Sequence, residues 1–249
     1  MTTSDCGDPA HCPVPGPADI DMRRVRTVAV PAGQRFYAAY RKSSWPEIFN
    51  SGFGETRFAP IYDASGVAIP TLYGGATRTV SLLESVFHEV HAGGARVIST
   101  AVDLAGRGLV ELHGKDPARF IDLSDTALAH LGLGAQAADA RTHLVAAGPG
   151  HYPCTRWWAE RLHARGNVGG HLPVGLRWQS RIAELAAGDA VLLGDLLTAD
   201  TASVFILFGD RVSVDLGDYA IGEHYADLAA NGAGGLVAAV ANQLGATIL

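Results

Sequence analysis

The sequence predicts a single mixed α+β domain, and three observations support this prediction. The chain has 249 residues, of which 48% are hydrophobic and 18% charged, which suits one globular core rather than two large ones. Segments of strand character and segments of helical periodicity are both present. They do not alternate regularly as the strands and helices of a doubly wound parallel sheet do, so an α+β architecture is favoured.

The chain is predicted to divide into a leader and one domain. Residues 1–22 are rich in Pro, Gly and Asp, which is typical of a flexible leader, and they lack the features of a signal peptide. Residues 23–249 are predicted to form the domain. No later segment has an apolar run of membrane length, and the formal charge of -6 does not favour binding to nucleic acid. We therefore expect a cytoplasmic protein that binds neither membranes nor nucleic acid directly.

The first half of the domain is predicted to hold two strands, a long loop and a helix. The strands are residues 26–30 and 35–40, separated by a turn at residues 31–33. Residues 43–68 contain several glycines and prolines but also five aromatic residues, which indicates an ordered loop. Apolar residues at helical spacing predict a helix over residues 79–92, which Gly93 and Gly94 would end.

The second half is predicted to contain four strands and three helices. The strands cover residues 96–104, 108–112, 204–208 and 211–216, and the last two would form a hairpin through Gly209 and Asp210. The helices cover residues 124–131, with Ser124 as N-cap, residues 155–164, and an Ala- and Gly-rich segment within residues 228–249.

Four short blocks carry a resemblance to a known family, whereas the Walker loop and the dinucleotide fingerprint are both absent. The blocks are QRFYAAY with Arg35, ETRFAP with Arg57, TLYGGATRTVSLLESVFHEV with Tyr73 and Glu84, and GLRWQSRI with Ser180. Their order and the Tyr-to-Glu spacing resemble those of the RES-domain family. The chain departs from the family pattern directly before Arg57, where relatives usually have Gly and this chain has Thr56.

The resemblance implies a fold similar to ADP-ribosyltransferases of the diphtheria-toxin type and cleavage of NAD+ at the nicotinamide–ribose bond, by hydrolysis or phosphorolysis. It also implies that the protein is the toxin of a toxin–antitoxin pair, with a helix-turn-helix antitoxin covering the active site. NAD+ is then the substrate, and neither a cofactor nor a metal is expected. ADP-ribosyl transfer to a protein and a catalytically inactive NAD-binding module are the alternatives, and a homo-oligomer is left open.

The resemblance also assigns roles to five residues. Glu84 is the expected catalytic carboxylate, because cleavage builds positive charge on the ribose that a fixed carboxylate stabilises. Arg35 and Arg57 are expected to bind the pyrophosphate by forked hydrogen bonds, with Arg57 also counted among the catalytic residues. Tyr73, also counted as catalytic, is expected to stack on the nicotinamide, and Ser180 is expected to bind its amide or a ribose hydroxyl.

Other interpretations of single motifs belong to other classes of protein. Glu84, His88 and His91 share a helix face in the predicted helix, which suggests a metallohydrolase, although the pattern is not His-Glu-x-x-His. Cys154 near His151 suggests a thiol nucleophile.

Two further interpretations concern structure or binding without catalysis. Cys6, His11 and Cys12 would be three ligands of a zinc site, but the fourth ligand and the paired short spacing are missing from this segment. Trp157 and Trp158 are candidates for a partner surface if the domain binds without turnover, although core packing is the ordinary role of such residues.

Overall fold

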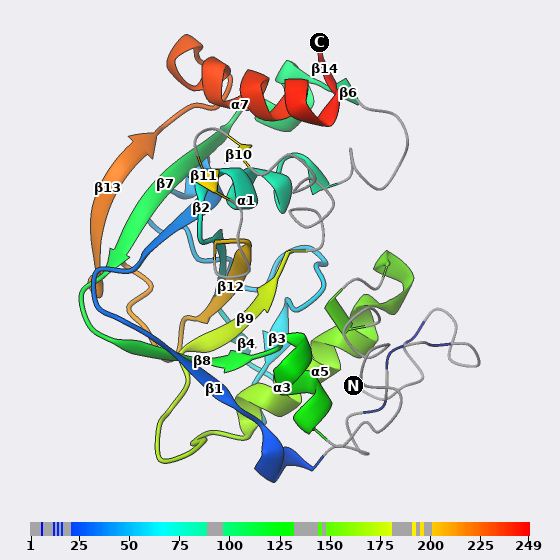
Figure 1. Cartoon of the computed structure of the whole chain (residues 1–249). Helices are drawn as coiled ribbons and strands as arrows, with labels where there is room; N and C mark the ends of the chain where they lie inside the picture. Colours follow the sequence, from blue (N-terminus) through cyan, green and yellow to red (C-terminus); the bar gives the residue numbers. More distant parts are fainter. Residues whose placement is uncertain are drawn as a thin grey trace.

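The expected mixed α+β architecture is confirmed by a computed structural model, which describes residues 6, 12, 14, 16, 21–88, 97–131, 144–145, 148–180, 191–192, 195–196 and 201–249. Within these residues a curled eight-stranded sheet forms the centre, with β1 and β8 towards one end and β7 and β13 at the other (Figure 1). The strand order is β1 (Thr27–Val30), β8 (Ala118–Asp122), β9 (Gly175–Gln179), β12 (Ser203–Phe208), β5 (Thr71–Gly75), β2 (Arg35–Arg41), β7 (Arg107–Gly114) and β13 (Tyr219–Tyr225). Neighbours run antiparallel, except β8 and β9, which are parallel.

Short elements and helices surround this sheet. Two-stranded ladders join β3 (Ile61–Tyr62) to β4 (Ala68–Ile69), β6 (Val97–Ile98) to β14 (Thr247–Ile248), and β10 (Val191–Leu192) to β11 (Asp195–Leu196). The helices are α1 (Arg78–Leu83), α3 (Asp125–His130), α5 (Tyr152–Ala164) and α7 (Asn231–Leu244). Single helical turns occur at η4 (Met22–Arg24), η5 (Lys42–Ser44), η6 (Thr100–Leu104) and η8 (Pro149–His151). In the described part of the chain, no helix is long and apolar enough to cross a membrane.

Both faces of the sheet are covered, because the side chains of its central strands alternate between two apolar cores. Tyr37 and Ala39 of β2 point to the larger core, which includes residues of α1, α5 and α7. Phe36, Ala38 and Tyr40 point to the smaller core on the other face. A residue's position along a strand therefore decides which face it lines.

The centre of the sheet leads directly into α1 through a contact that requires glycine. A Cβ atom on Gly75 would lie 2.9 Å from the Val80 carbonyl carbon and would overlap the Ser81 backbone nitrogen. Thr77 then caps α1, since its side chain accepts a hydrogen bond of 3.2 Å from the Val80 N–H. The missing side chain at Gly75 thus lets α1 pack directly on β5.

Most predicted elements are confirmed. The structure has the strands predicted at residues 26–30, 35–40, 108–112 and 204–208, and the helices predicted at 124–131, 155–164 and within 228–249. Ser124 caps α3 as expected, and Gly245 ends α7 in the left-handed conformation. The loop at 43–68 is ordered, with buried side chains that include Phe49 and Phe58.

The helix predicted over residues 79–92 is too long. It ends at Leu83, and in the turn that follows the backbone N–H groups of Ser85, Val86 and Phe87 all donate to the Leu82 carbonyl. Residues 89–96, with the predicted stop at Gly93 and Gly94, lie outside the described residues.

Two predicted strands are also wrong. Residues 96–104 were expected to be one strand, but β6 has two residues and a π-type turn follows, with the Ser99 side chain accepting from Val102 N–H. Residues 211–216 form turns and bends, and Leu216 has a positive φ of 64°. The expected hairpin is therefore absent, and the next strand, β13, pairs with β7 rather than with β12.

The expected leader is represented by few described residues. Cys6 and Val14 are buried in the larger core, and Cys12 packs against it. The rest of residues 1–20, apart from residue 16, lies outside the described part, so the boundary at residue 22 stays a prediction.

We predict that Gly75→Ala lowers the free energy of unfolding by about 2 kcal/mol or more, because the new methyl group must separate β5 from α1. Gly235→Ala in α7 is the matched control, since a Cβ there meets nothing within 4 Å. That control should raise stability by about 0.5 to 1 kcal/mol. Denaturant unfolding measures both, and equal effects of the two substitutions would contradict the close contact at Gly75.

Candidate active site

The Tyr73 hydroxyl links β5 to the loop that carries Arg57. It lies 2.9 Å from the Thr56 hydroxyl and accepts a 2.9 Å hydrogen bond from the Phe58 N–H. These two partners are the immediate neighbours of Arg57 in sequence. Thr56, the residue at which the chain departs from the family pattern, therefore helps to hold Arg57 beside Tyr73.

Tyr73 remains a neutral phenol in this position. Burial raises the pKa of Tyr73 to about 12, although the hydrogen bonds from Thr56 and Phe58 and the positive charge of Arg57 act in the opposite direction. Its ring meets the Trp178 ring edge-on, with centroids 6.1 Å apart. Tyr73 is thus a fixed hydrogen-bonding and packing group rather than a base at neutral pH.

The N-terminal turn of α5 holds the Arg57 loop from the other side. The Thr155 hydroxyl donates a short hydrogen bond to the Arg57 carbonyl. The Arg57 guanidinium carbon lies 5.9 Å from the centroid of the Tyr152 ring, within the range of a cation–π interaction. Contacts to both β5 and α5 fix the backbone and the charged end of Arg57.

Glu84 and Ser180 are joined by a short hydrogen bond. Glu84 directly follows the last residue of α1 and is half-buried, while Ser180 directly follows β9 and is fully buried. The Ser180 hydroxyl donates to Glu84 Oε1 at 2.5 Å, and the Ser180 N–H donates to the Ala202 carbonyl at 2.8 Å. Because Ser180 is held by its own backbone, it fixes the orientation of the carboxylate.

Tyr73 and Glu84 line the same small cavity. The cavity has a volume of about 30 Å³, and its lining residues are Ala39, Tyr73, Gly74, Ser81, Glu84, Ser85 and Val204. Four of the five predicted site residues, Arg57, Tyr73, Glu84 and Ser180, are therefore connected through this region by direct contacts or a shared cavity.

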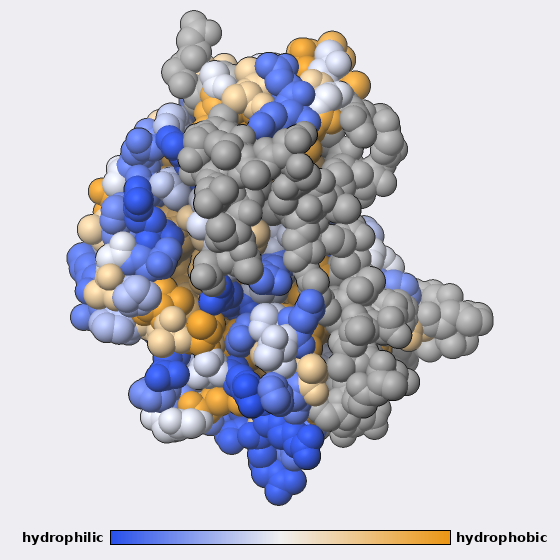
Figure 2. All heavy atoms as spheres, in the orientation of Figure 1, coloured by the Kyte–Doolittle hydropathy of each residue, from blue (hydrophilic) through white to orange (hydrophobic). Residues whose placement is uncertain are grey.

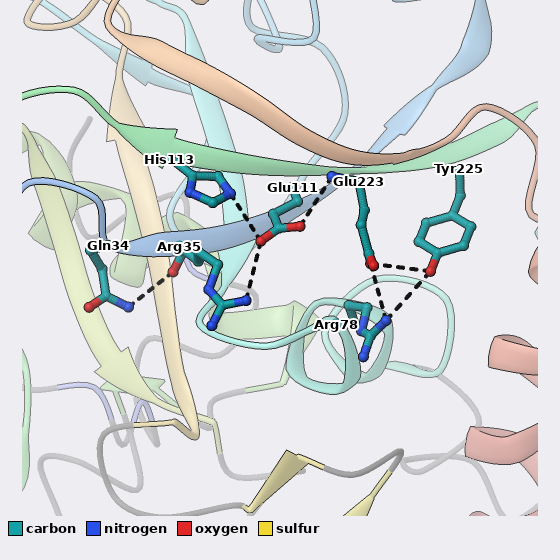
Figure 3. Close-up of polar contacts among 7 residues, drawn as sticks. All are labelled: Gln34, Arg35, Arg78, Glu111, His113, Glu223 and Tyr225. Atoms are coloured by element: carbon teal, nitrogen blue, oxygen red, sulfur yellow. Dashed lines mark hydrogen bonds and ion pairs between the residues drawn. The ribbon is translucent and has the colours of Figure 1, made fainter.

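Arg35 lies on the same face of the sheet but outside this cavity. It is four residues from Ala39, which corresponds to about 13 Å along an extended strand. Its side chain is 63% exposed and lies 3.6 Å from Glu111 Oε1 (Figure 3). The structure thus places Arg35 next to a different set of polar groups from those around Glu84.

Glu111 is the centre of that polar group, which sequence analysis missed. It is buried, and it accepts a 3.1 Å hydrogen bond from the Glu223 N–H and lies 3.0 Å from His113 Nε2 (Figure 3). Nearby, Arg78 at the start of α1 pairs with the Glu223 carboxylate at 3.1 Å. Figure 2 shows hydrophilic side chains gathered over this β7 and β13 end of the sheet. The available signal was Glu111 itself, a carboxylate among the apolar residues 108–112 of β7.

The surroundings of Glu111 favour its charged form. Burial acts to raise the pKa of Glu111, but the Glu223 N–H, the His113 and Arg35 charges and a hydrogen bond to Tyr37 outweigh it, so that the pKa is lowered. A buried carboxylate is therefore kept ionised beside Arg35, and it orients that arginine.

The alternative sites receive little support. His91 and His11 lie outside the described residues, so the two metal hypotheses that include them stay predictions. Cys154 is buried and has thiols as neighbours, which does not fit a nucleophile open to substrate. Trp158 is fully buried in the larger core and is not part of a partner surface, whereas Trp157 is half-buried.

The contact between Tyr73 and Thr56 predicts energetic coupling. We expect Tyr73→Phe and Thr56→Val each to lower the free energy of unfolding by about 1 to 2 kcal/mol, since each leaves a polar partner unsatisfied. The double variant should lose less than the sum, by at least about 0.5 kcal/mol. Thr56→Ser, which keeps the hydroxyl, should retain the coupling, and strictly additive losses would refute it.

Glu111 predicts a dependence of stability on pH. Its pKa is lowered in the folded protein from the ordinary value of 4.5, so its stabilising contribution is present above that pH and is lost as the pH falls through the lowered value. Unfolding curves measured from neutral to acidic pH should therefore fall less steeply for Glu111→Gln than for the wild type. The exposed Glu47→Gln should follow the wild type, and parallel curves for all three proteins would contradict the prediction.

Comparison with known proteins identifies the family of the chain. The model of the RES domain matches residues 29–215. The crystal structure of the M. tuberculosis MbcT–MbcA toxin–antitoxin complex is similar at 15% sequence identity and a TM-score of 0.43, over 85% of this chain and 90% of that chain. A search of curated proteins finds no match. Since the RES domain model spans most of the sequence, the chain belongs to the RES-domain family.

Proposed function

We propose that this protein cleaves NAD+ at the nicotinamide–ribose bond and transfers the ADP-ribosyl group to water or phosphate. The observation that carries the proposal is the 2.5 Å bond between Ser180 and Glu84 beside the cavity that Tyr73 lines. It joins residues from separate blocks of the RES pattern. Family membership supports the same assignment.

Glu84 acts as the catalytic carboxylate in this proposal. Loss of nicotinamide leaves positive charge on the ribose ring, and a carboxylate held in advance stabilises this charge without having to reorganise. The Ser180 hydroxyl bonds to Oε1, and in this proposal Oε2 is the oxygen that contacts the ribose or the acceptor. A buried hydroxyl is suited to hold the carboxylate, because it excludes competing rotamers in the free enzyme.

The two arginines bind the pyrophosphate in this proposal. The loop that carries Arg57 is held at Tyr73 by the Thr56 and Phe58 contacts, and the Arg57 guanidinium lies over the Tyr152 ring. Arg35 extends the positive charge along the same face, and Glu111 orients it. The cavity of about 30 Å³ is too small for a nicotinamide ring as it stands, so in this proposal it widens when the nicotinamide end binds beside Glu84, and the rest of NAD+ lies along the exposed face towards Arg35. Tyr73 then packs against the nicotinamide.

We infer further that the curled sheet is a variant of the ADP-ribosyltransferase-like fold and that the protein is a cytoplasmic toxin. A helix-turn-helix antitoxin would inhibit it by covering the cavity and Arg35.

We propose no metal or cofactor for the reaction, because Glu84 stabilises the positive charge on the ribose and the two arginines bind the negative charge of the pyrophosphate. A homo-oligomer is compatible with this proposal but not required by it.

The proposal predicts that purified protein releases nicotinamide from NAD+ and that Glu84→Gln lowers kcat by about 10²- to 10³-fold. Ser180→Ala, which frees the carboxylate, should lower kcat by about 10- to 100-fold. Glu47→Gln is the matched control, because Glu47 is exposed and carries no role in the site. Chromatography of the products gives the rates.

The products separate the alternatives. ADP-ribose formed without phosphate indicates hydrolysis, its phosphorylated form in the presence of phosphate indicates phosphorolysis, and label from NAD+ on a protein indicates transfer. A folded wild type that binds NAD+ without releasing nicotinamide would establish the inactive binding module instead. Unchanged turnover by Glu84→Gln would remove Glu84 from the mechanism.

A further inference from the structure

The three cysteines of the chain meet at the start of α5. Cys6 and Cys12 come from the N-terminal segment, whereas Cys154 lies in the first turn of α5, and none of them forms a disulfide. The Cys12 and Cys154 sulfur atoms are 3.4 Å apart, and Cys6 Sγ lies 3.6 Å from His151 Nδ1. Four soft metal-ligating side chains are thus gathered from two distant parts of the sequence.

The distances fit a tetrahedral metal site. Zinc binds sulfur at about 2.3 Å and imidazole nitrogen at about 2.0 Å, so neighbouring ligand atoms in a tetrahedron are separated by about 3.5 to 3.8 Å. The 3.4 and 3.6 Å separations are close to these values. Cys6 Sγ, Cys12 Sγ and His151 Nδ1 also lie within 4.8 Å of one another. Cys154 is not part of this mutually close group but contacts Cys12, so its thiol must turn towards the other ligands to close the site around one ion.

The ligand set and its placement identify the kind of site. Three thiolates and one imidazole form one of the sets that structural zinc prefers, and four protein ligands leave no open position for catalysis. His151 is the N-cap of α5 and Cys154 is its third residue, so both of these ligands lie at the N-terminal end of one helix. Cys6 and Cys154 are buried, whereas Cys12 and His151 are partly exposed.

We propose that Cys6, Cys12, Cys154 and His151 bind one structural zinc ion that attaches the N-terminal segment to α5. Binding releases the three thiol protons to solvent and leaves three thiolates on the metal. The ion would also fix the first turn of α5, where Tyr152 and Thr155 contact Arg57. The site is independent of whether NAD+ is the substrate.

The first test is the metal content of the full chain, purified without chelators and without a metal-affinity step. We expect about one zinc per chain that survives dialysis. Cys154→Ser and His151→Ala should each lose most of this zinc, while His171→Ala, which changes an exposed histidine, should keep it. Zinc removal should lower the unfolding temperature of the wild type but not that of Cys154→Ser.

The second test replaces zinc with Co²⁺, which reports its ligands by absorption. The wild type should show the intense visible bands of tetrahedral cobalt and sulfur-to-cobalt charge transfer, and Cys154→Ser, which binds the metal poorly, should lose most of both signals. The wild-type spectrum decides the question even if a variant fails to fold. A metal-free wild type with three titratable thiols, a weak octahedral cobalt spectrum, or a native Cys12–Cys154 disulfide would each overturn the proposal.

Discussion

The close packing of α1 on β5 at Gly75 is the constraint on which the candidate site depends. Because Gly75 has no side chain that would overlap the backbone of α1, the helix packs directly against the central strand, and it ends at Leu83. Tyr73 precedes Gly75 in the sequence and Glu84 follows α1, and the short strand-to-helix connection brings both side chains to the lining of one cavity. The sheet neighbours of β5 complete the arrangement, since β12 connects it to β9 and so to Ser180.

The charged residues of the site are held by elements outside this unit. Arg57 is fixed between the Tyr73 hydroxyl and α5, so the position of its charge depends on how α5 is anchored. A zinc ion at the start of α5 would make the N-terminal segment part of that anchor. Arg35 is oriented instead by Glu111, whose ionised state is maintained by the strands on either side. Rigid scaffold elements thus position groups that would otherwise be mobile surface arginines.

Sequence patterns predicted the elements whose own residues show a clear apolar pattern. They missed the features that depend on contacts between residues far apart in the sequence. The strand at 204–208 was predictable because it is apolar on both faces. The helical spacing of the apolar residues after Leu83 led to a helix that was predicted too long. Val86 and Phe87 are buried in the core, but a turn and not a helix places them there. The pairing of Tyr73 with Glu84 could be recognised from the sequence, because both residues lie in one block with the spacing of the family. The role of Glu111 was not, since apart from His113 its partners come from β2 and β13. The proposed zinc ligands His151 and Cys154 likewise lie about 140 residues from Cys12.

A crystal structure of Glu84→Gln with NAD+ tests the central claim most directly, because the variant keeps the shape of the site and slows turnover. The account predicts that the nicotinamide ribose lies beside residue 84, with the ring against Tyr73 and the pyrophosphate at Arg57. NAD+ bound in the apolar cavity on the opposite face of the sheet, which Phe36, Phe205 and Leu207 help to line, would contradict it.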